Sequence, residues 1–250
     1  SAASDVYKRQ NRYGSNSLKY DFMKMKNKPD NVLPMWVADM DFKCSDEILN
    51  DLHKKVNHGI FGYSKNDEEY FNAIKKWYLN KFDIELKQEW LVITPVVGVA
   101  LAQSVKALTN ENDYVLINNP VYYTFSKIVL DNKRQIISSD LVLRDGHYEI
   151  DFSDFENKIK QYNVKMFLLC SPHNPIGRVW TKDELDKIVK ICSKYKVFIV
   201  SDEIHCDFAW NNNHICLLKY ENYKDHIILC TSPTTVSYTH LRAHETVLDL

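Results

Sequence analysis

Glycine is scarce in this sequence, with only 6 among 250 residues. No G-x-G-x-x-G pattern follows any apolar run, which argues against a dinucleotide-binding fold. Long apolar runs are also absent: residues 197–200 fall far short of the roughly 20 residues needed to cross a bilayer. The first residues lack the apolar stretch of a signal peptide. The sequence therefore supports neither a nucleotide-binding protein of this type nor a membrane protein.

An excess of charge of one sign is absent as well. The 32 Lys and Arg residues nearly balance the 33 Asp and Glu residues, which leaves a net charge of −1. This balance gives no support for binding to nucleic acid. The 6 cysteines include no C-x-x-C pair, and most lie in apolar runs, where a thiol behaves as a small hydrophobe. We expect no disulfide framework and a reducing, cytoplasmic compartment.

The two ends of the chain differ in pattern from the middle. Residues 1–10 and 236–250 resemble translated sequencing-adaptor sequence, and we interpret them as artefacts rather than unusual natural termini. His240, His244 and Glu245 lie in the second of these ends. Their order differs from the H-E-x-x-H motif of zinc proteases, so we expect no metal site there.

Short apolar runs alternate with helical patterns through the middle of the chain. This alternation predicts an α/β fold with a mainly parallel sheet and helices on both faces. The predicted strands are 90–94, 113–118, 135–138, 165–170, 196–201 and 226–230. The predicted helices are 67–82, 99–108, 122–130, 153–162 and 181–195, with a further helix that begins at Ser45. Capping boxes are predicted from Ser153 with Glu156 and from Thr181 with Glu184, and core positions for Trp77, Tyr78 and Phe82.

Polar and aromatic side chains follow the carboxyl ends of four predicted strands. Ligands of parallel sheets bind at this edge. A flat, anionic, heteroaromatic ligand would suit the side chains here: Asp202 could hold a ring N–H⁺, Asn174 a phenolic oxygen, and Tyr122 could stack on the ring. Taken singly, each residue is more common as a cap, a turn residue or a core aromatic. The four segments are NNPVYY at 118–123, SPHNPIG at 171–177, SDEIH at 201–205 and TSPT at 231–234.

The segment SPHNPIGRVWT followed by VSDEIH resembles the signature of fold-type I pyridoxal-phosphate enzymes, the aspartate aminotransferase superfamily. Within it, LPMWVADMDF at 33–42, FGYS at 61–64 and SDEIH at 201–205 are similar to cystathionine or cysteine-S-conjugate β-lyases of the MalY/PatB type. The similarity runs from about residue 11 to residue 234. It implies pyridoxal 5′-phosphate as the cofactor and the fold-type I architecture.

The resemblance implies a cofactor contact for each matching residue. Asp202 would pair with the pyridinium nitrogen and keep the ring an electron sink. Asn174 would bond the phenolic oxygen, and Tyr122 would stack on the ring. His205 lies where many aminotransferases carry tyrosine, and histidine at this position matches the lyase branch.

The remaining implied contacts concern the phosphate and the substrate. The backbone amides of Val97 and Gly98, at the start of a helix, would bind the phosphate. Ser232 would add a hydroxyl, and Tyr63 would reach the phosphate of the partner subunit. Val96 stands where the family usually has glycine, which leaves the contacts of this loop open. The residues expected on the substrate side are Trp36, Val37 and Ala38.

The lysine that the resemblance implies is missing. In this family it forms the Schiff base with the cofactor and directly follows the stretch that matches 231–234. Thr235 occupies that position here, and no lysine follows Lys224. We therefore interpret the chain as truncated before the catalytic lysine, with the C-terminal small domain absent.

The resemblance also implies a domain organisation and an activity. Residues 11–65 would form a small-domain part and dimer arm, and residues 66–235 an incomplete cofactor-binding large domain. The parent protein would be a homodimeric C–S β-lyase that converts cystathionine or another cysteine S-conjugate into a thiol, pyruvate and ammonia. Two alternatives stay open: an aminotransferase on the same scaffold, and a fragment with no catalytic role that binds the cofactor weakly or not at all. The second is what we expect of the 250-residue chain itself.

Overall fold

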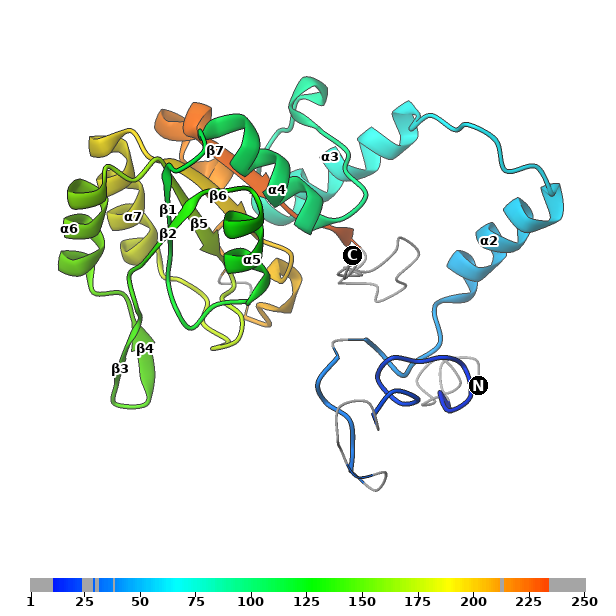
Figure 1. Cartoon of the computed structure of the whole chain (residues 1–250). Helices are drawn as coiled ribbons and strands as arrows, with labels where there is room; N and C mark the ends of the chain where they lie inside the picture. Colours follow the sequence, from blue (N-terminus) through cyan, green and yellow to red (C-terminus); the bar gives the residue numbers. More distant parts are fainter. Residues whose placement is uncertain (1–10, 24–28, 30–31, 38, 212–213, 234–250) are drawn as a thin grey trace. The chain divides into compact units, whose positions relative to one another are not determined.

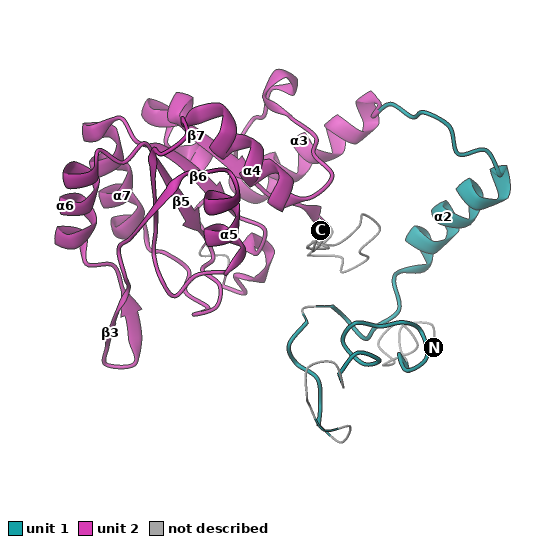
Figure 2. Cartoon of the chain, in the orientation of Figure 1, with its two compact units in different colours: residues 1–65, 237–240 teal, residues 66–236, 241–250 magenta. Residues whose placement is uncertain are grey.

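The computed structural model describes residues 11–23, 29, 32–37, 39–211 and 214–233. Residues 1–10 and 236–250, interpreted above as artefacts, lie outside these ranges. The chain divides into two compact units (Figure 2). Unit 1 contains residues 1–65 and 237–240, and unit 2 contains residues 66–236 and 241–250.

Unit 2 is built on a five-stranded sheet with the order β2-β1-β5-β6-β7 (Figure 1). Every neighbouring pair in this sheet is parallel. The strands are β1 (Tyr114–Ile117), β2 (Gln135–Ser138), β5 (Met166–Cys170), β6 (Phe198–Asp202) and β7 (Ile227–Cys230). The predicted α/β fold with a mainly parallel sheet is confirmed.

Helices cover both faces of this sheet, so alternate strand residues are buried in two separate clusters. Burial on both faces explains why the strands read as continuous apolar runs. The helices on the two faces are α4 (Val97–Leu108) and α5 (Thr124–Asp131) on one, and α6 (Phe152–Tyr162) and α7 (Lys182–Tyr195) on the other (Figure 1). None of the helices in the described ranges has the length and apolar content that crossing a bilayer requires.

Helix α3 (Glu68–Phe82) packs against the segment between β6 and β7. Its Tyr78 and Phe82 are buried in a cluster with Cys206 and Cys216. Trp77, which we expected in the core, is 49% exposed. Successive helical residues point about 100° apart, so the side chains of Trp77 and Tyr78 lie on different faces of α3, and only that of Tyr78 lies in the core.

The start of α6 differs from the predicted capping box. The helix is capped by Asp151, whose carboxylate accepts the backbone N–H of Ser153 at 3.0 Å. Glu156 does not reach back to the cap, because its carboxylate accepts a hydrogen bond from Lys194 at 2.7 Å. The capping residue is therefore two positions earlier than predicted, although the helix itself is confirmed.

Substitutions at the start of α6 are expected to show whether Asp151 or Ser153 is the N-cap of this helix. Asp151→Ala should lower the free energy of unfolding by about 1 kcal/mol, because two first-turn amides lose their acceptor. Ser153→Ala should change it by less than about 0.5 kcal/mol. Thr181→Ala serves as the positive control, since the capping box of Thr181 with Glu184 is present as predicted. Urea denaturation followed by circular dichroism measures all three, and an equal loss in Ser153→Ala would contradict the assignment.

Two segments of unit 2 differ from the predicted elements. Residues 91–94 are not in a strand; Gln88–Trp90 form a 3-10 helix instead, and Val92 is 82% exposed. A two-stranded antiparallel hairpin, β3 (Val142–Arg144) and β4 (His147–Glu149), was not predicted. Its turn residues, Asp145 and Gly146, have φ of 48° and 79°, as a type I′ turn requires.

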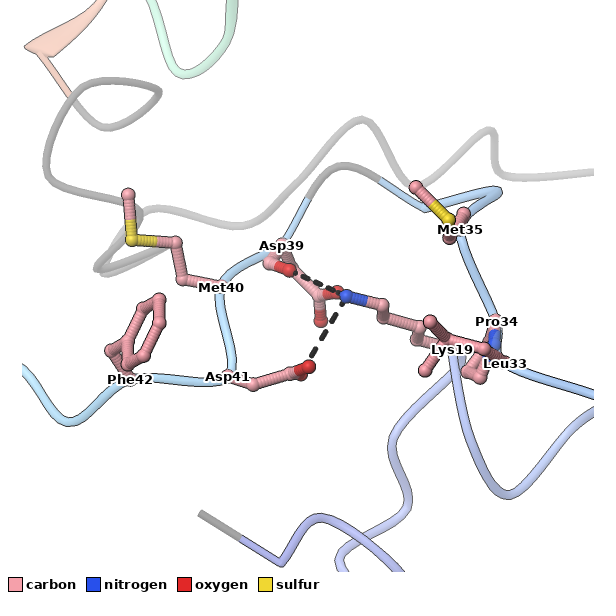
Figure 3. Close-up of a pocket in the computed structure, with 8 residues that line it drawn as sticks. All are labelled: Lys19, Leu33, Pro34, Met35, Asp39, Met40, Asp41 and Phe42. Carbon is pink, nitrogen blue, oxygen red and sulfur yellow. Dashed lines mark hydrogen bonds and ion pairs between the residues drawn. The ribbon is translucent and has the colours of Figure 1, made fainter. Parts of the chain in front are cut away.

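Unit 1 contains the helix α2 (Asp46–His58), with Ser45 as its N-cap as predicted. A group of charged side chains lies earlier in the unit: Arg12 and Lys19 form ion pairs with Asp39 and Asp41. Lys19 and both carboxylates line a pocket of about 320 Å³ (Figure 3). These ion pairs tie together segments about 20 residues apart in the sequence.

Candidate cofactor site

The carboxyl ends of the parallel strands meet at one edge of the sheet, and the order of the strands changes direction there. β1 lies between β2 and β5, so the chain leaves β1 toward one side and later returns on the other. In open parallel sheets such a switch point is where ligands bind. The segments that follow β1, β5, β6 and β7 at this edge are the four singled out in the sequence.

Asp202 lies at this edge as the last residue of β6, between β5 and β7. It is 6% exposed, and its ladder partners are Cys170 of β5 and Cys230 of β7. Among its contacts, its carboxylate accepts the backbone N–H of Ile204 at 3.2 Å. Burial, and next the charge of Asp202, raise the pKa of the Cys170 thiol and raise that of Cys230 to about 12. The edge therefore holds a buried carboxylate between two protonated thiols.

Tyr122 and Asn174 lie at the ends of the two adjacent strands β1 and β5. Tyr122 is half-buried, with its ring centre 5.0 Å from that of Tyr123. Asn174 is also half-buried, and its backbone N–H donates to Cys170 Sγ at 3.3 Å. An aromatic face and an amide thus follow neighbouring parallel strands at the edge that carries Asp202.

His205 and Ser232 lie beyond the ends of β6 and β7. His205 immediately precedes the 3-10 helix η3 (Cys206–Phe208), with its ring centre 6.1 Å from that of Phe208. Ser232 follows β7 by two residues. Both follow strands that end at the carboxyl edge of the sheet.

The start of α4 lies at the same edge, because α4 ends just before β1 begins and so runs against the strands. Neither a side-chain cap nor an acidic residue occupies its first turn. A methyl group added at Gly98 would meet no atom within 4 Å. Val96 has φ of −148°, extended backbone that any residue adopts, so the unusual valine is accommodated. This helix start, beginning at Val97, has the amides and the positive dipole of an anion site.

Glu203 is a site residue that the sequence analysis missed. It is 1% exposed and directly follows Asp202. Its carboxylate accepts hydrogen bonds from the Ser201 hydroxyl and the Leu217 backbone N–H, each at 3.0 Å, and lies 2.8 Å from His214 Nε2. An acidic residue at the end of a predicted buried strand was the available signal. Glu203 ties the end of β6 to the segment that leads to β7.

The residues predicted to contact the substrate or the partner subunit belong to unit 1. Trp36 is 43% exposed, Val37 is half-buried, and Tyr63 is fully exposed. Ala38 and Thr235 lie outside the described residues. Their roles stay predictions.

The sequence model of the family aminotransferase class I and II matches residues 31–235 of the chain. The chain belongs to this family. It is 36% identical over 229 residues to the cystathionine beta-lyase PatB of Bacillus subtilis, a match that covers 91% of the chain and 59% of PatB. It is 30% identical over 207 residues to the protein MalY of Escherichia coli, which covers 82% of the chain and 53% of MalY.

Solved structures of the family share the fold. Cystalysin from Treponema denticola, which contains a pyridoxal 5′-phosphate cofactor, matches with a TM-score of 0.87 and 36% identity, over 94% of the chain and 61% of cystalysin. The chain thus spans 53–61% of the length of these three relatives. The resemblance to fold-type I enzymes inferred from the sequence is confirmed.

Proposed function

We propose that a protein carrying this chain is a pyridoxal-phosphate-dependent C–S β-lyase that cleaves cystathionine or another cysteine S-conjugate. The observation that carries the proposal is the edge of the sheet in unit 2, where Tyr122, Asn174 and Asp202 follow three adjacent strands. The names of the relatives support this choice, since PatB is a cystathionine beta-lyase. The aminotransferase activity that the family name also covers is the second candidate.

The residues present fit the cofactor. The uncapped start of α4, with open space at Gly98, suits a phosphate. The buried carboxylate of Asp202 suits a protonated ring nitrogen, and the amide of Asn174 suits a phenolic oxygen. When bound, the cofactor would supply an electron sink for a carbanion at the substrate α-carbon. Asp202 would hold the proton on the ring nitrogen, and Tyr122 would cover one face of the ring.

The chain by itself is proposed to bind the cofactor only weakly and not to turn over substrate. A base is needed to move the proton at the α-carbon, and in this family a lysine has that role. Thr235 stands at the matching position. The last lysine, Lys224, precedes β7 and so lies toward the opposite edge of the sheet from Asp202.

The expected assembly and location are part of the proposal. A homodimer is proposed, with Tyr63 reaching the partner's phosphate site and Trp36, Val37 and Ala38 on the substrate side. Exposure of Tyr63 is compatible with such a contact. A reducing, cytoplasmic compartment is proposed because all six cysteines are free thiols.

Two assays test the function. A full-length version of the protein, given cystathionine, is expected to release pyruvate without any added 2-oxo acid; strict dependence on such an acceptor would establish the aminotransferase instead. The 250-residue chain, mixed with pyridoxal phosphate and reduced with borohydride, is expected to show no adduct on one specific lysine. Such an adduct together with turnover would overturn the non-catalytic assignment of the chain.

A further inference from the structure

We propose that His173 is a positioning residue of the cofactor site, which fixes the separation of Tyr122 and Asn174 by a hydrogen bond between the segments that follow β1 and β5. The choice of pyridoxal phosphate as the ligand in this inference rests on the proposed function. We propose no direct contact between His173 and the cofactor.

The two segments need such a link because the strands beneath them part early. β1 pairs with β5 at two positions, Val115 with Met166 and Leu116 with Phe167. β5 continues to Cys170, paired with β6 along five positions. The segment after β1 is instead bonded toward β2, where Asn118 Nδ2 donates to the Ser139 carbonyl at 2.8 Å.

His173 reaches across this separation. Its Nε2 lies 2.9 Å from the carbonyl oxygen of Pro120, two residues before Tyr122. A carbonyl can only accept, so Nε2 carries the hydrogen. The side chain is 2% exposed, and burial lowers the pKa of the imidazole. Nδ1 is buried and makes no hydrogen bond, as expected for the neutral ring with its hydrogen on Nε2.

The ring of His173 is held from the other side as well. Trp180, 1% exposed, packs edge-on against it with ring centres 5.4 Å apart, and Trp180 Nε1 donates to the Cys170 carbonyl at 2.9 Å. The backbone N–H of His173 donates to the Arg178 carbonyl at 2.7 Å. The imidazole therefore has little freedom to rotate, and it transmits the position of β5 to the segment that carries Tyr122.

The first test is the tautomer of His173. Nitrogen-15 NMR of the ligand-free chain at pH 7 is expected to show a neutral ring with the hydrogen on Nε2. A neutral ring with its hydrogen on Nδ1 would overturn the hydrogen bond to Pro120 and with it the proposal.

The second test compares pyridoxal phosphate binding, followed by the circular dichroism induced in the bound cofactor. His173→Phe fills the space but has no donor, and we expect its affinity to fall about five- to tenfold, with a changed induced signal. His173→Gln keeps a donor near the Nε2 position and is expected to restore affinity to within about twofold. His226→Phe is the matched control, because His226 stacks on Phe198 and Tyr223 just before β7, away from the site.

The outcomes separate this inference from the proposed function. Wild-type binding with equal affinity and signal in His173→Phe would overturn the role of His173 and leave the function standing. A wild-type chain that binds no pyridoxal phosphate would overturn the proposed cofactor site of this chain, the full-length pyruvate assay would decide the function, and the tautomer would still decide the hydrogen bond. Should His173→Phe fail to fold, the glutamine variant decides: weakened binding despite a retained donor would contradict the proposal.

Discussion

The Glu203→Ala variant is expected to lose about 3–5 kcal/mol of unfolding free energy, because the buried donors that its carboxylate accepts from would be left without a partner. Glu203 is buried at the end of β6 and accepts hydrogen bonds from Ser201 and Leu217. Without its carboxylate, the Leu217 N–H and the ring of His214, 8% exposed, would lose their buried acceptor. A buried polar group without a partner costs about 1–3 kcal/mol, so the losses accumulate.

Two further variants make this result specific. Glu203→Gln keeps an acceptor for Leu217 but replaces the carboxylate that lies 2.8 Å from His214 Nε2 with an amide, so we expect roughly half of the loss. Glu111→Ala removes an exposed carboxylate that pairs with Lys133, where both side chains are more than half exposed, and should cost less than about 1 kcal/mol. Urea denaturation measures all three. Equal stability of Glu203→Ala and Glu111→Ala would contradict the proposed anchoring role.

The hydrogen bonds of Glu203 could not be predicted from the sequence. Its partners His214 and Leu217 are 11 and 14 residues away along the chain. Neither periodicity nor capping patterns report contacts at that separation. The strands themselves could be predicted because burial on both faces leaves continuous apolar runs. The run at 91–94 has the same composition but no strand partner among the described residues, since composition alone does not show pairing.

The edge of the sheet that carries the candidate site in unit 2 could be predicted from the sequence for a geometric reason. Parallel strands end at one edge, so residues that follow β1, β5 and β6 must gather there whatever their separation in the chain. Asp202 and Asn174 are examples. No such rule applies to Trp36 or Tyr63, which lie in irregular segments of unit 1. The bridge made by His173 was also missed, because Pro120 is 53 residues away in sequence.

Asp202→Asn is expected to weaken the binding of pyridoxal phosphate by about 10- to 100-fold at pH 7. The physical reason is the loss of a charge-assisted hydrogen bond to a protonated ring nitrogen in a buried site, where Asp202 is 6% exposed. The asparagine has nearly the same shape, so packing against Cys170 and Cys230 is retained. Equilibrium titration of the cofactor measures the change, and Asp186→Asn is the control, because this half-buried residue of α7 bonds to the Tyr220 hydroxyl at 2.7 Å.

A second ligand tests which atom of the cofactor Asp202 contacts. An analogue of pyridoxal phosphate with carbon in place of the ring nitrogen cannot donate to the carboxylate. The difference between wild type and Asp202→Asn should therefore shrink to less than about threefold with this analogue, because the interaction energy belongs to the pair. The same 10- to 100-fold loss with both ligands would mean that Asp202 acts through the structure of the sheet edge, and the assignment of the ring nitrogen to this carboxylate would be wrong.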